Sequence, residues 1–132
     1  MSVGVLIVTH PHIGRDVLAA ARHILKTLPL EVAVVEIGPD APPERLLEQI
    51  RERLAALDQG EGVLLLTDLF GATPSNLAVE AARGGPHRIV SGLSLPMLLR
   101  VLNYPDLSLD ALAAKAASAA DTIVDLPAPE RP

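Results

Sequence analysis

Three segments of this sequence combine polar, chemically active side chains with a position directly after a run of apolar residues. They are residues 9–12 (THPH), residues 67–76 (TDLFGATPSN) and residues 91–96 (SGLSLP). Together they supply imidazole, carboxylate and hydroxyl groups and a turn that contains glycine. In an open parallel sheet such segments meet at the carboxyl ends of the strands, where ligands of this fold class bind.

His10 and Asp68 are the pair that favours a specific chemistry. A histidine that accepts a phosphoryl group attacks as neutral imidazole, so its other ring nitrogen carries the proton and needs an acceptor. A carboxylate such as Asp68 provides that acceptor and stabilises the positive character that grows on the ring during attack. If the strands before these residues are neighbours, the two side chains face each other. The pattern therefore predicts His10 as a nucleophile that Asp68 orients.

Residues 71–76 are the candidate site for the phosphoryl oxygens. A helix is predicted to begin near Pro74, with Thr73 as a candidate N-cap. The free backbone N–H groups and the dipole of a helix N-terminus bind anions, and catalysis of this kind consists mainly of positioning and charge stabilisation. The predicted phosphate-binding residues are Thr9, Gly71, Ala72, Thr73, Pro74, Ser75 and Asn76.

Simpler interpretations exist for each of these residues taken alone. A histidine or an aspartate after a strand is often structural or a turn cap, and only their joint placement favours a functional site. His12 together with His10 and Asp68 could hold a metal ion, but we predict no metal site. His23 and His87 are predicted to be exposed or structural.

Composition narrows the class of protein further. The chain has 132 residues, no cysteine and a formal net charge of −5. Without a cluster of Lys and Arg, nucleic-acid binding is not expected. No glycine-rich nucleotide-binding motif is present, and we predict no cofactor.

No apolar run reaches the roughly 18 residues that a membrane span needs. The apolar start is interpreted as a strand and not as a signal peptide, so a cytoplasmic location is expected.

The elements that would position these segments alternate between apolar runs and amphipathic stretches. Strands are predicted over residues 3–9, 32–37, 63–66 and 87–91, and helices over residues 14–28, 43–57, 74–83, 96–102 and 108–120. Right-handed crossovers then give an α/β fold with an open, doubly wound parallel sheet of order 2-1-3-4 and helices on both faces. Residues 1–126 are predicted to form one domain, with a possible antiparallel last strand over 122–126 and a disordered tail over 127–132.

Three blocks of this sequence resemble a known protein family. They are residues 5–10 (VLIVTH), 64–76 (LLLTDLFGATPSN) and 91–99 (SGLSLPMLL). They resemble the enzyme IIA component of the mannose family, which belongs to the bacterial phosphoenolpyruvate-dependent sugar phosphotransferase system. The resemblance extends to about Val124.

The resemblance implies a phosphocarrier that is phosphorylated on His10, with Asp68 orienting the ring and the turn of residues 71–76 holding the phosphoryl group. The implied donor is the histidine-containing phosphocarrier protein, and the implied acceptor is an enzyme IIB component for sugar uptake. A homodimer that exchanges its C-terminal strand is implied as well, with contact to the membrane only indirectly, through a transporter complex.

Two residues depart from the family pattern. Pro11 stands where glycine usually follows the active histidine, and Ser94 stands where asparagine is common. Proline lacks an N–H and restricts the preceding residue to extended conformations.

The sequence leaves three alternatives to a phosphocarrier for sugar uptake. They are a regulatory protein that signals by its phosphorylation state, a dihydroxyacetone-kinase phosphotransfer subunit, and a small-ligand binding domain without phosphoryl transfer.

Overall fold

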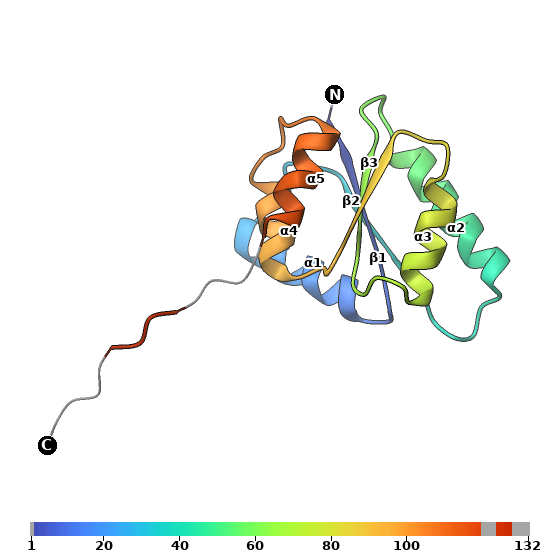
Figure 1. Ribbon diagram of the computed structural model, residues 1–132, viewed down its shortest axis with the longest axis horizontal. Coiled ribbons are helices and arrows are strands. Elements are labelled where there is room, and N and C mark those ends of the chain that lie inside the picture. The colour runs from blue at the N-terminus through green and yellow to red at the C-terminus, as the bar shows by residue number, and fades with distance from the viewer. Residues whose placement is uncertain (1, 120–123, 128–132) are drawn as a thin grey trace, which may run out of the picture.

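Four parallel strands lie between two layers of helices in the computed structural model, which describes residues 2–119 and 124–127 (Figure 1). The strands pair in the order β2-β1-β3-β4, which confirms the predicted sheet. Their bounds are β1 Gly4–Thr9, β2 Val32–Glu36, β3 Val63–Thr67 and β4 His87–Ser91. The helices are α1 Ile13–Leu25, α2 Pro43–Leu57, α3 Thr73–Ala82, α4 Leu95–Leu102 and α5 Leu109–Ala117.

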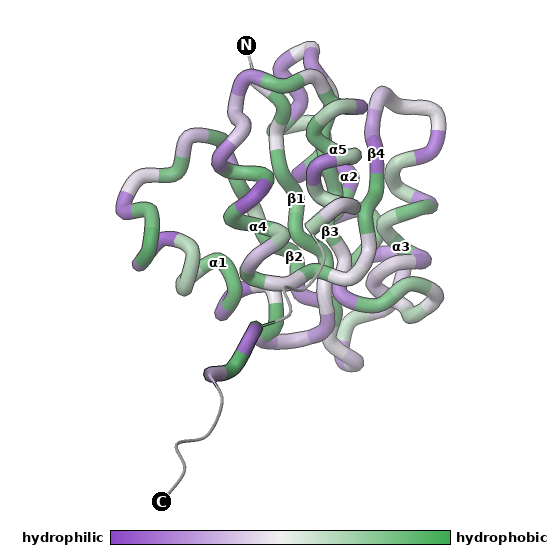
Figure 2. The backbone as a smooth tube through the Cα atoms, turned by 60° about the vertical axis from the view of Figure 1, so that its left-hand side comes forward, coloured by the Kyte–Doolittle hydropathy of each residue, from purple (hydrophilic) through white to green (hydrophobic). Residues whose placement is uncertain are grey.

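The two central strands are buried on both faces, as expected for a parallel sheet covered by helices. Along β1, Val5 and Ile7 belong to one apolar cluster, whereas Leu6 and Val8 belong to the other. The strands accordingly run as hydrophobic segments through the centre of the molecule (Figure 2). This continuous apolar character is why the sequence predicted β1 and β3 so directly.

Each helical layer closes one of the two clusters. Helices α1, α4 and α5 cover one face of the sheet, and α2 and α3 cover the other (Figure 1). Helix α2 starts with Pro43, a residue suited to the first turn, and its buried stripe consists of Leu46, Ile50, Leu54 and Leu57. Among the described residues, no helix combines the length and the apolar character needed to cross a bilayer.

The order of the strands creates one switch point. The chain leaves β1 through α1 toward β2, and it leaves β3 through α3 toward β4, although β1 and β3 are neighbours. The loops that follow β1 and β3 therefore diverge to opposite sides of the sheet and leave a crevice between their starts. Residues 10 and 68 are the first after these two strands.

Several predicted boundaries were wrong by a few residues. Helix α1 ends at Leu25 instead of residue 28 because Lys26 adopts a φ of 65° and its N–H turns back to the carbonyl of Arg22 at 2.9 Å. Thr73 is not the N-cap of α3; Ala72 is, without a side-chain cap, because Thr73 is already helical. Helix α5 ends at Ala117, not at residue 120.

The predicted C-terminal strand is wrong for residues 124–126. They are exposed and extend away from the sheet without strand pairing, because no neighbouring strand of the same chain is there to satisfy their backbone groups. Residues 122–123 of that prediction, and residues 128–132 of the predicted disordered tail, lie outside the described part of the chain. The domain boundary at residue 126 stays a prediction.

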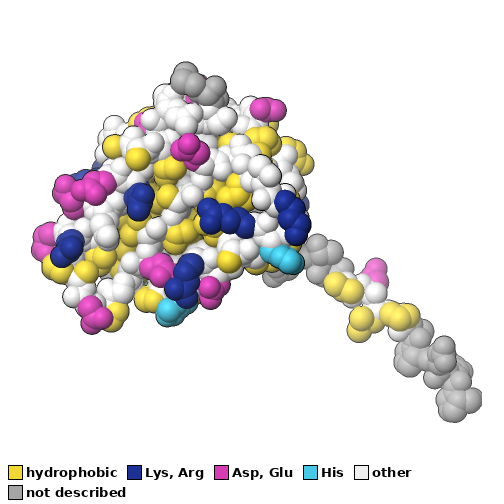
Figure 3. Space-filling view, turned by 180° about the vertical axis from the view of Figure 1, so that it is seen from behind, with side chains coloured by type: hydrophobic (Ala, Val, Ile, Leu, Met, Phe, Trp, Pro, Cys, Tyr) yellow, Lys and Arg dark blue, Asp and Glu magenta, His cyan; other side chains and the backbone are white. Residues whose placement is uncertain are grey.

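Charged side chains of both signs are interspersed on the face shown in Figure 3, where Lys and Arg stand as separate residues over an apolar background. This face includes histidine side chains at its margin, and it does not present a single-sign patch.

Candidate active site

The loop after β1 is folded tightly onto its own strand. The Thr9 hydroxyl is buried, donates to the carbonyl of His10 at 2.8 Å and accepts the N–H of Gly14 at 2.9 Å. A Cβ atom at Gly14 would lie 2.6 Å from Cγ2 of Ile7, so only glycine allows the first turn of α1 to approach this closely. The structure therefore uses the Thr9 hydroxyl to shape the loop that carries His10, and the predicted phosphate-binding role of Thr9 stays a prediction.

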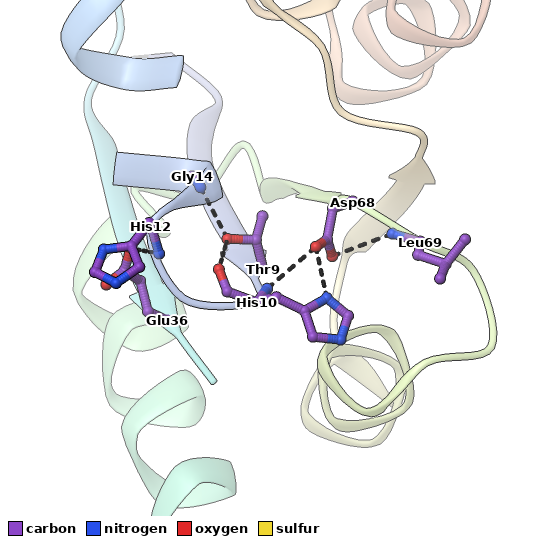
Figure 4. Close-up of polar contacts among 7 residues, drawn as sticks. All are labelled: Thr9, His10, His12, Gly14, Glu36, Asp68 and Leu69. Carbon is purple, nitrogen blue, oxygen red and sulfur yellow. Dashed lines mark hydrogen bonds and ion pairs between the residues drawn. The ribbon is translucent and has the colours of Figure 1, made fainter. Parts of the chain in front are cut away.

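Asp68 meets His10 across the crevice between β1 and β3. One carboxylate oxygen, Oδ2, lies 2.7 Å from His10 Nδ1 and accepts the backbone N–H of His10 at 3.2 Å. The other, Oδ1, accepts the N–H of Leu69 at 3.1 Å (Figure 4). The imidazole is thus held through both its ring and its main chain by a carboxylate that is itself fixed.

Burial and hydrogen bonding act in opposite directions on Asp68. Burial raises the pKa of Asp68. The hydrogen bonds from the ring and the backbone N–H of His10, together with a backbone hydrogen bond from its own segment, outweigh burial and lower the pKa below the usual value. The group is therefore ionised at neutral pH and accepts from a protonated Nδ1. Its side chain is 10% exposed, whereas that of His10 is 44% exposed. His10 Nε2 has no hydrogen-bond partner among the described residues, so it is the ring nitrogen that is free to react.

The turn between β3 and α3 lies at the same edge of the sheet. Gly71 adopts a φ of 88°, which suits glycine, and the side-chain amide of Asn76 donates to its carbonyl at 3.3 Å. The first-turn N–H groups of Thr73 and Ser75 have no acceptor among the described residues, as is usual at a helix N-terminus. Ser75 itself is buried, and Thr73 is exposed. The turn thus offers backbone donors beside Asp68.

Ser94, the second departure from the family pattern, caps helix α4. Its hydroxyl accepts the N–H of Met97 at 3.2 Å, and the preceding N–H of Leu93 donates to the carbonyl of Thr67 at 2.9 Å. Serine and asparagine are similarly good N-caps. The serine therefore performs the capping that asparagine could provide at this position.

Sequence reasoning missed a second set of contacts on the other side of the loop. His12 adopts a left-handed conformation with φ 76°, which costs a non-glycine residue about 1–2 kcal/mol. Its N–H donates to Oε2 of Glu36 at 2.7 Å, and its ring Nδ1 lies 2.6 Å from Nη2 of Arg15. His12 points away from His10 (Figure 4). The sequence feature that could have predicted this contact is the position of Glu36 at the end of β2, the strand next to β1.

A metal site receives no support from this arrangement. Within the part of the chain that the structure describes, no three His, Cys, Asp or Glu side chains are grouped closely enough to hold a metal ion. His23 is exposed on α1, and His87 lies at the start of β4, at the opposite end of the sheet from His10.

Comparison with known proteins agrees with this fold. The profile of the family described as "PTS system fructose IIA component" (EIIA-man) matches residues 4–119. The mannose-specific EIIAB component of Escherichia coli K12 is 31% identical over 107 residues, which are 80% of this chain. The mannose/sorbose-specific IIA subunit of Enterococcus faecalis superposes with a TM-score of 0.77 at 28% identity, over 98% of this chain and 100% of that one.

The chain belongs to this family of phosphotransferase-system IIA components, as its sequence predicted. It spans 33% of the length of the E. coli relative. The transcriptional regulatory protein LevR of Bacillus subtilis is also similar, at 27% identity over 83% of this chain and 12% of that protein. The family therefore includes domains that form parts of larger and functionally different proteins.

Proposed function

We propose that this protein is a cytoplasmic phosphocarrier in which Nε2 of His10 receives a phosphoryl group and passes it to another protein. The donor is the histidine-containing phosphocarrier protein, and the acceptor is an enzyme IIB component for sugar uptake. The observation that supports this proposal is the 2.7 Å contact between Nδ1 of His10 and Asp68. It occupies one ring nitrogen and leaves the other free at the surface.

The transfer step needs no proton to leave the ring. The Nε2 lone pair attacks the phosphorus, and a new N–P bond forms while the N–P bond to the donor's imidazole breaks. The donor takes back the electron pair of the broken bond. Nδ1 keeps its proton, and the ionised Asp68 stabilises the positive charge that develops on the His10 ring. The reverse sequence delivers the group to the acceptor.

The N-terminus of α3 is the proposed cradle for the phosphoryl oxygens. The N–H groups of Thr73 and Ser75, which have no acceptor within the described residues, and the exposed hydroxyl of Thr73 are donors of the kind that bind phosphate. The other residues of the turn, Gly71, Ala72, Pro74 and Asn76, shape this segment.

Leu69 and Phe70 support a protein as the exchange partner. They directly follow Asp68 and are 61% and 78% exposed, although Phe70 is the only phenylalanine of the sequence. Exposed aromatic and aliphatic side chains of this kind are typical anchors of protein interfaces. A partner protein that covers them would be brought directly over the imidazole of His10.

The proposed function is tested by loading the protein with phosphate. The protein is incubated with phosphoenolpyruvate, enzyme I and the histidine-containing phosphocarrier protein, and its mass is measured. We expect an acid-labile gain of about 80 Da, the mass of one phosphoryl group on nitrogen. The gain is absent in His10→Ala and retained in His23→Ala, which removes an exposed histidine elsewhere on α1. Absence of the gain in the wild type, with partners active on another acceptor, contradicts the proposal.

A regulatory role is the second candidate, and the similarity to LevR favours it. In that case phosphorylation of His10 changes the charge next to Asp68 and so the affinity for a partner. The two roles differ in the fate of the phosphoryl group. Rapid loss from the phosphorylated protein on addition of an enzyme IIB supports transport, whereas retention with altered partner binding supports regulation.

We further propose a homodimer through the open edge of β4. A hollow of about 430 Å³ lies beside this strand and α5, with apolar residues such as Ile89, Val90 and Met97 in its lining. Val124 and Leu126 of the C-terminal segment are 74% and 83% exposed, so an exchanged segment would bury them against the partner. Light scattering is expected to give a dimer for the wild type and a monomer for Val124→Asp/Leu126→Asp. A monomeric wild type contradicts this proposal.

A further inference from the structure

We propose that Glu36 is a positioning residue for phosphoryl transfer at His10, because its carboxylate holds the backbone of His12 in the left-handed conformation that the loop requires. This inference rests on the proposed function of His10. Glu36 does not touch the imidazole of His10, and it acts through the main chain of the two residues that follow His10.

The end of β2 contacts the loop at two points. Glu36 is the register partner of Thr9 in the sheet, and its Oε2 accepts the N–H of His12 at 2.7 Å. The next residue, Ile37, donates its N–H to the carbonyl of Thr9 at 2.8 Å. The strand thus fixes the chain immediately before and after His10 and Pro11. No other described group accepts the N–H of His12.

Pro11 explains why such a contact is needed here. Proline has a fixed φ near −65° and no N–H, so it offers no backbone donor that could hold the loop. The turn into α1 is therefore made at His12, with φ 76°, a conformation that disfavours any residue with a Cβ atom. The hydrogen bond to Glu36 forms only while His12 keeps this conformation, and it compensates for the backbone strain.

The conformation of His12 is coupled to His10 through Pro11. Because proline restricts the residue before it to extended backbone conformations, relaxation at His12 displaces Pro11 and turns the peptide of His10. The backbone N–H and ring Nδ1 of His10 share a single oxygen of Asp68, at 3.2 and 2.7 Å. A rotation of that peptide misaligns both contacts. Small errors in the position of a nucleophile reduce transfer rates strongly.

The side chain of His12 takes no part in this mechanism. Its ring contacts Arg15, and it is directed away from the site (Figure 4). The function of Glu36 is therefore to stabilise a backbone conformation. Glycine reaches this conformation without steric cost, so glycine at position 12 should make Glu36 dispensable.

The test compares Glu36→Ala, Glu36→Gln, His12→Gly and the double variant Glu36→Ala/His12→Gly in single-turnover transfer from the phosphorylated donor. Glu31→Ala is the matched control, because Glu31 is an exposed glutamate that directly precedes β2, at the opposite end of the strand from Glu36. We expect Glu36→Ala to lower the rate at saturating donor about tenfold, with half-saturation unchanged. Glu36→Gln, whose amide oxygen can accept the same N–H, and the double variant should both recover to within about twofold of wild type.

A second readout does not depend on phosphoryl transfer. Long-range ¹H–¹⁵N NMR reports whether Nδ1 of His10 carries the proton that it shares with Asp68. We expect this tautomer to be depleted in Glu36→Ala and restored in the double variant. Wild-type rate and tautomer in Glu36→Ala overturn the inference, as does a double variant as impaired as Glu36→Ala. If the wild type accepts no phosphate, the proposed function fails, while the tautomer measurement still decides the role of Glu36.

Discussion

The two ends of the sheet each hold an aspartate and a histidine, and the two histidines have opposite hydrogen-bonding roles. At the carboxyl end, His10 Nδ1 donates to Asp68, and Nε2 has no hydrogen-bond partner in the described part of the chain. At the amino end, His87 Nδ1 accepts the N–H of Val63 at 3.2 Å. Asp58 there is engaged by the N–H groups of Gly60 and Gly62 at 2.9 and 3.1 Å.

The comparison teaches that the residue types alone do not define the site. Burial lowers the pKa of His87, with the charge of Asp58 acting in the opposite direction, so this ring is neutral and serves as an acceptor for the backbone. A Cβ at Gly85 would lie 2.7 Å from the ring, which shows how closely the chain encloses it. His10 instead keeps a nitrogen open to solvent and gains a partner that stabilises positive charge.

Removal of the carboxylate at the active end should have the largest effect. Asp68→Asn preserves the shape of the side chain but removes the negative charge that stabilises the ring during attack. We expect single-turnover phosphoryl transfer to fall about 10²-fold or more, with circular dichroism unchanged. The matched variant Asp58→Asn should transfer at the wild-type rate. Equal losses in the two variants would contradict the functional difference between the two ends.

The exposed aromatic residue beside the active end should contribute to partner binding and not to chemistry. For Phe70→Ala we expect the donor concentration at half-saturation to rise about tenfold, which corresponds to about 1.4 kcal/mol, while the rate at saturation stays unchanged. Ile24→Ala, which removes another exposed apolar side chain, on α1, is the control. A fall in the saturated rate for Phe70→Ala would instead place this residue in the transfer step.

The aspartate at the amino end should contribute to stability only. Asp58→Ala removes the acceptor of two backbone N–H groups in the turn before β3, of which that of Gly60 is exposed and that of Gly62 is partly buried. We expect urea unfolding to show a loss of about 1 kcal/mol, with phosphate loading of His10 unaffected. Unchanged stability would mean that water replaces these hydrogen bonds at no cost.

The pKa of His87 predicts the smallest effect. Because the folded state lowers this pKa from 6.5, the unfolded chain binds more protons as pH falls through that value, so the free energy of unfolding decreases toward acid. The stabilisation is complete above pH 6.5. His87→Asn, whose side-chain oxygen can replace Nδ1 as the acceptor, should flatten unfolding curves measured between neutral and mildly acid pH. An unchanged slope would assign the pH dependence to other groups.

Much of the fold was predictable because each element carries its own signal. The apolar runs of β1 and β3 and the proline that begins α2 mark these elements without reference to tertiary contacts. The C-terminal strand was wrong at residues 124–126 because strand formation depends on a neighbour, and an apolar β-branched sequence does not reveal whether one is present. The end of α1 at Leu25 likewise depends on the φ of Lys26, a value that lysine rarely adopts.

The pairing of His10 with Asp68 was predictable because both residues directly follow adjacent strands of a sheet whose order follows from the topology rules. The contacts that support this pair were not predictable from the sequence. The roles of Gly14 and Glu36 depend on how closely α1 approaches β1 and on the register between β1 and β2, which three-dimensional packing determines. The left-handed conformation of His12 is also invisible in a residue type that usually avoids it.

The most direct test of the central claim is long-range ¹H–¹⁵N NMR of the phosphorylated protein, which identifies both the histidine and the ring nitrogen that bears phosphate. We predict a phosphoryl group on Nε2 of His10, with Nδ1 still protonated and shared with Asp68. Phosphate on Nδ1 of His10, or on another histidine, would contradict the role assigned to the 2.7 Å contact between His10 and Asp68.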